Sequence, residues 1–338
     1  MIDYLTHPAM SNFNPFELPS KQGGGGGMHL KTYFVKEALD QFYPNSRMIT
    51  DTFDIQNKVV LIEPLRLALG IDPEKYDRDF ENNDQLLEGL KKTDATKILL
   101  TTEFSMLRLP SAMRRQLVYA CDAVAASCKF QSKLLRYAGI ETPHIIRDTI
   151  SDIYCSPIPW KDRKDQIVSV GQISWQKNTS RTIALFKALE GKVERIYVGS
   201  HALWRALDQN EHSIRLQNEL YENCDRVIRE CTIAELAKLF YVTKYGLWTA
   251  IHDTTSTGTI SMLRAGIPVV SAEHGYAHEL PIQKAYSLSD QIQAIQDMLD
   301  ADNDKMSELS EKAIEWCEDN VSYDSFARQL TNVMRTVY

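Results

Sequence analysis

Small and hydroxyl-bearing residues follow a buried apolar run in the second half of the chain. The run YGLWTAI at 245–251 reads as a strand, and Asp253 and the triplet TGT at 257–259 come after it. The apolar pattern resumes at 260–265, which predicts a helix whose first N–H groups lack partners within the helix. Such a helix start favours negative charge, and small side chains allow a diphosphate to approach it. An ordinary hydroxyl-rich helix cap is the alternative interpretation.

A lysine occupies a comparable place earlier in the chain. In IVSVGQISWQKNTSRTIALFKAL, a predicted strand ends at Gly171, and Lys177 lies in the loop before the next helical pattern. An ammonium group in such a loop is a point charge that could face developing negative charge. A solvated surface lysine is the alternative.

Gly23 to Gly27 are five of the fifteen glycines in the chain. They lie between a predicted first strand, in MIDYLTH, and a helical pattern that begins near Met28, which is where a parallel α/β sheet binds ligands. The run fits neither the dinucleotide pattern GxGxxG nor the P-loop, because no third glycine stands at 28–30 and no Gly-Lys-Ser/Thr follows. We interpret it as a ligand loop with mobility, and plain flexibility is the alternative.

The elements that must position these residues follow an α/β pattern. Short apolar runs alternate with helical periods along most of the 338 residues, which predicts parallel sheets with helices on both faces. The length suits two domains. The proline- and charge-rich segment 156–165 reads as their linker, and the last stretch is helical by period.

The composition excludes several classes of protein. No apolar stretch is long enough for a membrane span, and no secretory signal is recognisable, so we expect a cytoplasmic protein. The net charge of -7 gives no global attraction to nucleic acid. The six cysteines form no CxxC pair and read as reduced thiols, not as metal ligands.

Two long stretches resemble GT-B glycosyltransferases. One opens at Ile167 with the strand–Gly–loop–Lys–helix order described above, and the other runs from Cys231 to Leu280 and contains Gly266-Ile267-Pro268. The second resembles the donor-binding core of the retaining GT4-like group. The resemblance implies an N-terminal acceptor-side Rossmann-like domain at 1–155, the linker, a sugar-nucleotide-binding Rossmann-like domain at 166–322, and a C-terminal helix at 323–338 that could return to the first domain.

The resemblance also implies roles for particular residues. Lys177 would meet the donor phosphates, and Asp253 would hold sugar hydroxyls as the first carboxylate of an E-x7-E motif. The second carboxylate of that motif, which binds the ribose, is replaced here by Ser261, and the arginine usual after the glycine is Gln172. The full set of predicted donor-binding residues is Gly26, Gly27, Gly171, Gln172, Lys177, Ser256, Thr257, Gly258, Thr259 and Ser261.

Other candidates belong to the acceptor side. Glu103 follows the predicted strand KILLTT and is the third catalytic candidate, beside Lys177 and Asp253. Acceptor-side candidates are His29, Arg108, Arg114 and Arg115. The last three belong to a basic cluster with Lys129, Lys133 and Arg136, which either contacts phosphates or is a set of solvated helix charges.

The resemblance therefore implies a retaining hexosyltransferase. It would move a sugar from a nucleotide-sugar donor, with UDP-hexose favoured, to a glycan or small-molecule hydroxyl, and it would need no metal or other cofactor. A faint likeness to phage DNA α-glucosyltransferases leaves hydroxymethylated DNA bases as an alternative acceptor. The replaced carboxylate and arginine leave a non-catalytic sugar-nucleotide-binding module as a second alternative. The failed GxGxxG pattern argues against a dinucleotide-dependent oxidoreductase.

Overall fold

The fold is known from a computed structural model. It describes residues 1–6, 13–18, 27–63, 85–101, 109, 111–174, 176–199, 211–251, 256–272 and 275–337. The chain divides into two compact units. Unit 1 contains residues 1–13, 31–149 and 320–338, and unit 2 contains residues 14–30 and 150–319. The chain therefore passes from unit 1 to unit 2 at 13/14 and at 149/150, and it returns at 30/31 and at 319/320.

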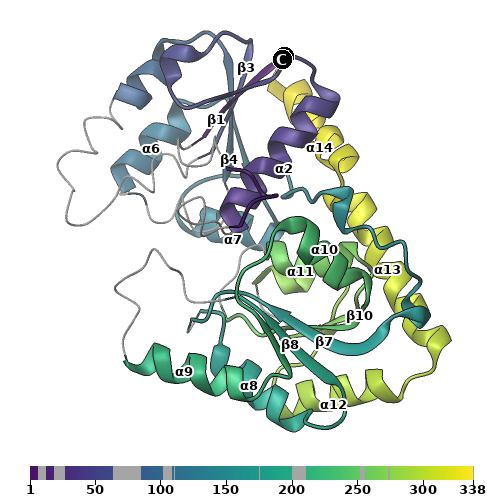
Figure 1. Cartoon of the computed structure of the whole chain (residues 1–338). Helices are drawn as coiled ribbons and strands as arrows, with labels where there is room; N and C mark the ends of the chain where they lie inside the picture. Colours follow the sequence, from purple (N-terminus) through teal and green to yellow (C-terminus); the bar gives the residue numbers. More distant parts are fainter. Residues whose placement is uncertain are drawn as a thin grey trace. The chain divides into compact units, whose positions relative to one another are not determined.

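Unit 1 is built on a six-stranded parallel sheet (Figure 1). Its order is β2 (Arg47–Ile49), β1 (Ile2–Leu5), β3 (Val59–Ile62), β4 (Thr96–Thr101), β5 (Ala123–Ala126) and β6 (His144–Ile145). All residues of β1, β3 and β5 are buried, as expected where helices cover both faces of a parallel sheet. Its helical elements include α2 (Gly27–Phe42), which belongs to this unit from Lys31 on, the segment 85–92, α6 (Ser111–Tyr119), α7 (Lys129–Tyr137), α14 (Tyr323–Val337) and a 3-10 turn, η2 (Thr52–Asp54).

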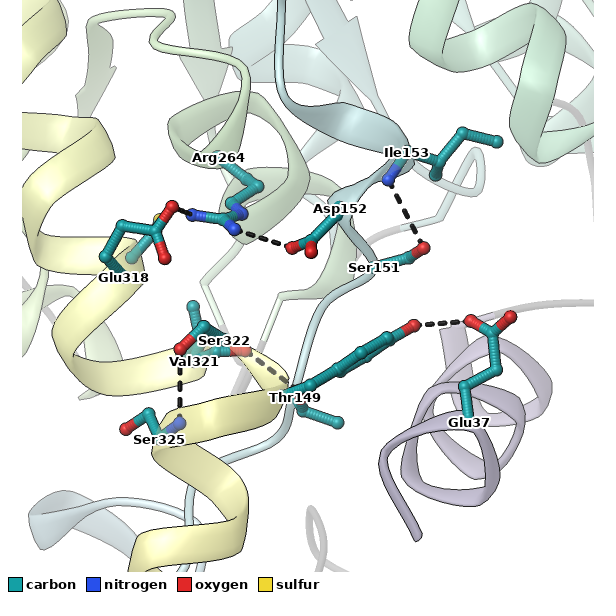
Figure 2. A network of polar contacts seen from close by, with 12 residues as sticks. Glu37, Thr149, Ser151, Asp152, Ile153, Arg264, Glu318, Val321, Ser322 and Ser325 are labelled. Atoms are coloured by element: carbon teal, nitrogen blue, oxygen red, sulfur yellow. Dashed lines mark hydrogen bonds and ion pairs between the residues drawn. The ribbon is translucent and has the colours of Figure 1, made fainter. Parts of the chain in front are cut away.

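Helices α2 and α14 lie side by side in unit 1 (Figure 1). The Tyr43 hydroxyl, just after α2, donates to the Ala327 carbonyl at 3.0 Å, and the Tyr323 hydroxyl donates to the Glu37 carboxylate (Figure 2). Helix α14 buries Phe326, Leu330 and Val333, whose spacing gives one apolar face. The C-terminal helix is thus part of the core of unit 1.

Unit 2 has a second six-stranded parallel sheet. Its order is β12 (Gln283–Lys284), β11 (Val269–Ser271), β10 (Thr243–Trp248), β7 (Lys164–Val170), β8 (Glu194–Val198) and β9 (Arg226–Ile228). Helices α8 (Thr179–Ala188), α9 (Glu211–Glu222) and α12 (Leu288–Asp300) cover one face, and α10 (Ile233–Tyr241) and α11 (Thr257–Arg264) cover the other (Figure 1). The remaining elements are α13 (Asn303–Val321) and the turns η3 (Asp152–Tyr154), η4 (Trp160–Asp162) and η6 (Gly275–Glu279).

Local sequence signals fix several helix ends in unit 2. Thr232 and Glu235 form a reciprocal capping box at the start of α10, and Ser287 and Asp290 form another at the start of α12. Helix α11 ends at Arg264, and Gly266, two residues further on, has φ +69°, a conformation that glycine adopts without strain. The residues that follow α11 lead directly into β11.

Candidate functional site

The order of the second sheet marks one place where a ligand is expected. From β7 the chain continues through α8 to β8 on one side, whereas β10 lies on the other side of β7 and leads through α11 to β11. Because α8 and α11 cover opposite faces, the carboxyl ends of β7 and β10 form a topological switch point. Ligands of open α/β sheets bind outside such strand ends.

The loop after β7 is fixed tightly against β8. The Gly171 N–H donates to the Val198 carbonyl at 3.0 Å, and the Tyr197 hydroxyl donates to the Gly171 carbonyl at 2.9 Å. Burial raises the pKa of Tyr197, so its hydroxyl stays a donor. Gly199 has φ +142°, and a Cβ there would lie 1.8 Å from the Gly171 oxygen. The backbone of this loop therefore has little freedom to move toward β8.

Lys177 lies over this loop. A Cβ placed on Gly171 would be 3.6 Å from Lys177 Cγ, so the side chain of the lysine packs along the glycine. The Lys177 carbonyl accepts a hydrogen bond from Thr249 Oγ1 at 2.8 Å, and the Ile251 N–H donates to the Gln176 carbonyl at 2.9 Å. These bonds join the loop after β7 to the segment after β10, so both strand ends hold the half-buried lysine.

Helix α11 begins at the same place. Its first turn contains Gly258, and a Cβ there would lie 3.3 Å from a methyl carbon of Val170, the last residue of β7. The Ser256 hydroxyl caps the helix and accepts from the Thr259 N–H at 3.3 Å. The helix starts at Thr257, three residues earlier than the sequence predicts, so the triplet at 257–259 is the first turn itself. The positive end of the helix is thus presented at the switch point.

The structure places the other donor-side candidates as follows. Gln172 is half-buried next to Gly171, while Ser256, Thr257 and Thr259 are buried. Ser261 is buried as well, and its hydroxyl donates to the Thr257 carbonyl at 2.8 Å, a bond within the helix. Its role at a ribose stays a prediction. Gly26, Glu103, Arg108 and Asp253 lie outside the described residues, so their predicted roles stay predictions too.

The described acceptor-side candidates and the rest of the basic cluster lie on three helices. The acceptor-side candidate His29 is in the first turn of α2 and is partly buried, and the donor-side candidate Gly27 is the first residue of the same helix. Arg114 and Arg115 are on α6, and Lys129, Lys133 and Arg136 are on α7. Met113 and Leu117 of α6 pack into the same apolar core as Leu135 of α7, so the two helices cover one core and turn their cations outward.

A group that the sequence analysis did not single out occupies the first sheet. Glu63 directly follows β3, which neighbours β1 at the switch point of that sheet, and it is buried. Its Oε2 accepts hydrogen bonds from the hydroxyls of Tyr4 (3.1 Å), Thr6 (2.9 Å) and Thr32 (3.0 Å). Burial raises the pKa of Glu63, although these three bonds oppose the shift. A carboxylate directly after a buried strand was the sequence signal that could have identified it.

The described residues show two further properties of this chain. They contain no helix long and apolar enough to cross a membrane. Within the same ranges, no group of three or more His, Cys, Asp or Glu side chains is arranged to hold a metal ion.

Comparison with known proteins gives likenesses of structure alone. No protein-family model and no curated protein sequence matches the chain. Sucrose-phosphate synthase from Thermosynechococcus elongatus has a TM-score of 0.69 at 14% identity, and the match covers 99% of this chain and 98% of that one. HepE from Anabaena, in complex with UDP and glucose, has a TM-score of 0.69 at 12% identity, with 99% of both chains covered.

A third similar structure is a UDP-forming α,α-trehalose-phosphate synthase from Burkholderia xenovorans in complex with glucose-6-phosphate. Its TM-score is 0.59 at 12% identity, and the match covers 93% of this chain and 79% of that one. Together with the two parallel sheets, these likenesses establish the GT-B fold that the sequence predicts.

Proposed function

We propose that this chain is a glycosyltransferase that uses a nucleotide-sugar donor. The donor's diphosphate would lie outside the carboxyl ends of β7 and β10. The observation that carries the proposal is that Lys177 and the first turn of α11 pack on consecutive residues at the end of β7. Lys177 packs on Gly171, and Gly258 of α11 packs on Val170, the residue before Gly171. HepE, whose structure is similar, is described with UDP and glucose.

The chemistry follows from this arrangement of charge. In sugar transfer, the bond from the anomeric carbon to the diphosphate oxygen breaks, and the acceptor hydroxyl forms a new bond to that carbon. Negative charge develops on the leaving diphosphate, which takes up the proton that the acceptor hydroxyl releases. The Lys177 ammonium and the positive end of α11 stabilise that charge in the transition state. Removing one preorganised group of this kind typically costs about 10²–10³ in rate.

The finer features are also proposed here. UDP-hexose is the favoured donor, because two of the similar structures are described with UDP or as UDP-forming. Retention of the anomeric configuration, the contact of Asp253 with sugar hydroxyls and the catalytic role of Glu103 are carried over from the GT4-like resemblance. Neither carboxylate belongs to the described residues, so substitution experiments must test both.

Mass spectrometry of the products tests the proposal directly. The protein would be incubated with a panel of UDP-, ADP-, GDP- and dTDP-hexoses, together with small-molecule and glycan acceptors. We expect transfer, or slow donor hydrolysis, with at least one UDP-hexose, and its loss in Lys177→Ala. Donor binding without turnover for any sugar nucleotide or acceptor would contradict the proposal. It would favour the sugar-nucleotide-binding module instead.

A second candidate function is transfer to hydroxymethylated bases in DNA. Helices α6 and α7 carry five cations (Arg114, Arg115, Lys129, Lys133 and Arg136) and no carboxylate, although the chain as a whole is acidic. Each helix ends in a tyrosine that is strongly exposed, Tyr119 at 86% and Tyr137 at 91%. Cations contact phosphates, and exposed aromatic rings stack on unpaired bases.

This candidate is tested with the same donors and hydroxymethylated DNA. Sugar on the DNA, with a lower DNA affinity in Lys129→Glu/Lys133→Glu, would support it. A matched control is Lys305→Glu, an exposed lysine on α13. If the DNA carries no sugar and all variants bind it with the same affinity, transfer to DNA is excluded.

A further inference from the structure

Three ionisable side chains are buried together in unit 1. Glu63 follows β3 and is 1% exposed, Lys31 of α2 is 3% exposed, and Asp148 follows β6 and is 7% exposed. Lys31 Nζ lies 2.9 Å from Asp148 Oδ2. Buried charges are costly unless they are paired, so the charges and the hydrogen bonds of these three side chains must compensate one another.

The two carboxyl groups each have an oxygen without a hydrogen bond. Glu63 Oε2 takes all three hydroxyl donors, whereas its Oε1 is buried and has no hydrogen-bond partner in the part of the chain that the structure describes. Asp148 Oδ2 is ion-paired with Lys31 but likewise has no hydrogen-bond partner among the described residues. Buried polar atoms are almost always satisfied by protein or by ordered water.

A small cavity lies beside these atoms. Its volume is about 10 Å³, and Glu63, Asp148, Lys31, Tyr4 and Thr101 are among its lining residues. That volume holds about one water molecule, and a buried water needs two to four polar partners. The cavity is too small for a phosphate or a sugar, and the ammonium on its wall opposes a metal cation.

The charges point to a neutral Glu63. The Lys31 ammonium and the Asp148 carboxylate compensate each other, so an ionised Glu63 would be a buried charge in excess. Burial raises the pKa of Glu63, and the charge of Asp148 raises it further. Two other ionisable groups line the described part of the cavity: Tyr4, whose pKa is also raised by burial, and Arg147, which is partly exposed to solvent. The lining residues from β4 and α14 are uncharged.

We propose that Glu63 carries its proton on Oε1 and that the cavity holds one water. The water accepts a hydrogen bond from Glu63 Oε1–H and donates one to Asp148 Oδ2. The proton belongs on Oε1 because Oε2 already accepts three hydrogen bonds. This arrangement satisfies both orphaned oxygens and links the end of β3 to the segment after β6.

The water and Glu63 together would fix the beginning of α2. Thr32 binds Glu63 and Lys31 pairs with Asp148, and these two residues directly follow the turn that carries His29. Glu63 is then a positioning residue for an acceptor-side turn. This last step alone rests on the proposed function, and the experiment below does not require activity.

Carbon-13 NMR of the wild-type protein tests the protonation state. With glutamate labelled at Cδ, the Glu63 signal is assigned by its absence in Glu63→Gln. We expect the chemical shift of a neutral carboxyl at pH 7, while exposed glutamates such as Glu141 show the shift of a carboxylate. A carboxylate shift for Glu63 at pH 7 would overturn the proposal, whatever the activity of the protein.

The pH dependence of stability gives a second measurement. A raised folded-state pKa means that the folded protein binds the proton more tightly than the unfolded chain. The stability contributed by Glu63 is therefore full at acidic pH and is lost as the pH rises through its folded pKa. Glutamine mimics the neutral acid. As the pH rises over that range, the melting temperature of Glu63→Gln should therefore fall less than that of wild type. Parallel profiles for wild type, Glu63→Gln and the exposed control Glu141→Gln would contradict a neutral Glu63.

A crystal structure at high resolution tests the water. We expect one density peak within hydrogen-bond distance of Glu63 Oε1 and Asp148 Oδ2. A dry cavity, or direct contact between the two oxygens, would overturn the water site. If Glu63→Gln fails to fold, Glu63→Asp serves to assign the NMR signal, and the wild-type measurements remain decisive.

Discussion

At the scale of single residues, the proposed donor site depends most directly on Lys177. We expect Lys177→Ala to lower kcat/KM by about 10²-fold, equivalent to about 2.7 kcal/mol of transition-state stabilisation. The lysine is half-buried and its backbone bonds are kept in the variant, so the melting temperature should stay near that of wild type.

The control for this substitution is Lys187→Ala. Lys187 is on α8 and forms an exposed pair with Glu219 at 2.7 Å, away from the loop after β7. Steady-state kinetics with the best donor should show wild-type rates for the control. Equal rates in both variants would remove Lys177 from the site.

Contacts between single residues differ in how well the sequence predicts them. Glu235 three residues after Thr232 predicts a helix start, and the capping box is present. Such local signals work because both partners lie within one turn. Glu63 escaped prediction because its partners are 31 to 59 positions away along the chain, and only the folded sheet brings them together.

At the scale of elements, most strands of both sheets were predictable as short apolar runs, and β2 and β12 were not. Strands β3, β4, β7 and β8 coincide with apolar runs because a parallel sheet buries both faces. Strands β2 (RMI) and β12 (QK) hold too few apolar residues to form such a run. The start of α11 was placed too late because its first turn holds small polar residues in place of apolar ones.

Helix α11 is anchored at its other end by Arg264. This buried guanidinium pairs with Asp152 of η3 at 2.6 Å and with Glu318 of α13 at 2.5 Å (Figure 2). Asp152 and Glu318 lie within three residues of the crossings between the units at 149/150 and 319/320, respectively. The network therefore joins the helix of the proposed donor site to both of these chain segments.

We expect the two carboxylates to contribute non-additively. Asp152→Asn or Glu318→Gln alone leaves Arg264 one partner, and since both acids are more than half exposed, each should cost about 1 kcal/mol or less. The double variant leaves a buried unpaired cation and should cost about 3 kcal/mol or more. Urea unfolding of the four proteins gives the coupling energy.

Glu315→Gln is the matched control for these substitutions, since it removes an exposed carboxylate from the same helix. Its effect should stay within about 0.5 kcal/mol. Strict additivity of the two single substitutions would mean that Arg264 does not depend on either pair.

At the scale of the whole molecule, the two units have separate apolar cores. The core of unit 1 gathers around β3, β4 and β5, and that of unit 2 around β7, β8 and β10. If the diphosphate binds at the switch point of the second sheet, the ligand stabilises unit 2 first. A ligand present at one hundred times its Kd adds about 2.7 kcal/mol to the free energy of unfolding of the unit that binds it.

Hydrogen exchange with and without UDP tests this division. We expect slower exchange in peptides that cover the loop after β7, the start of α8 and α11. Peptides of β3 and β5 in unit 1 should change little. Uridine, which lacks the diphosphate, should produce much weaker protection. Lys177→Ala should reduce the protection by UDP, because each change removes one partner of the interaction between the diphosphate and the Lys177 ammonium. Protection by UDP that is confined to unit 1 would place the nucleotide on the other sheet and refute the donor site.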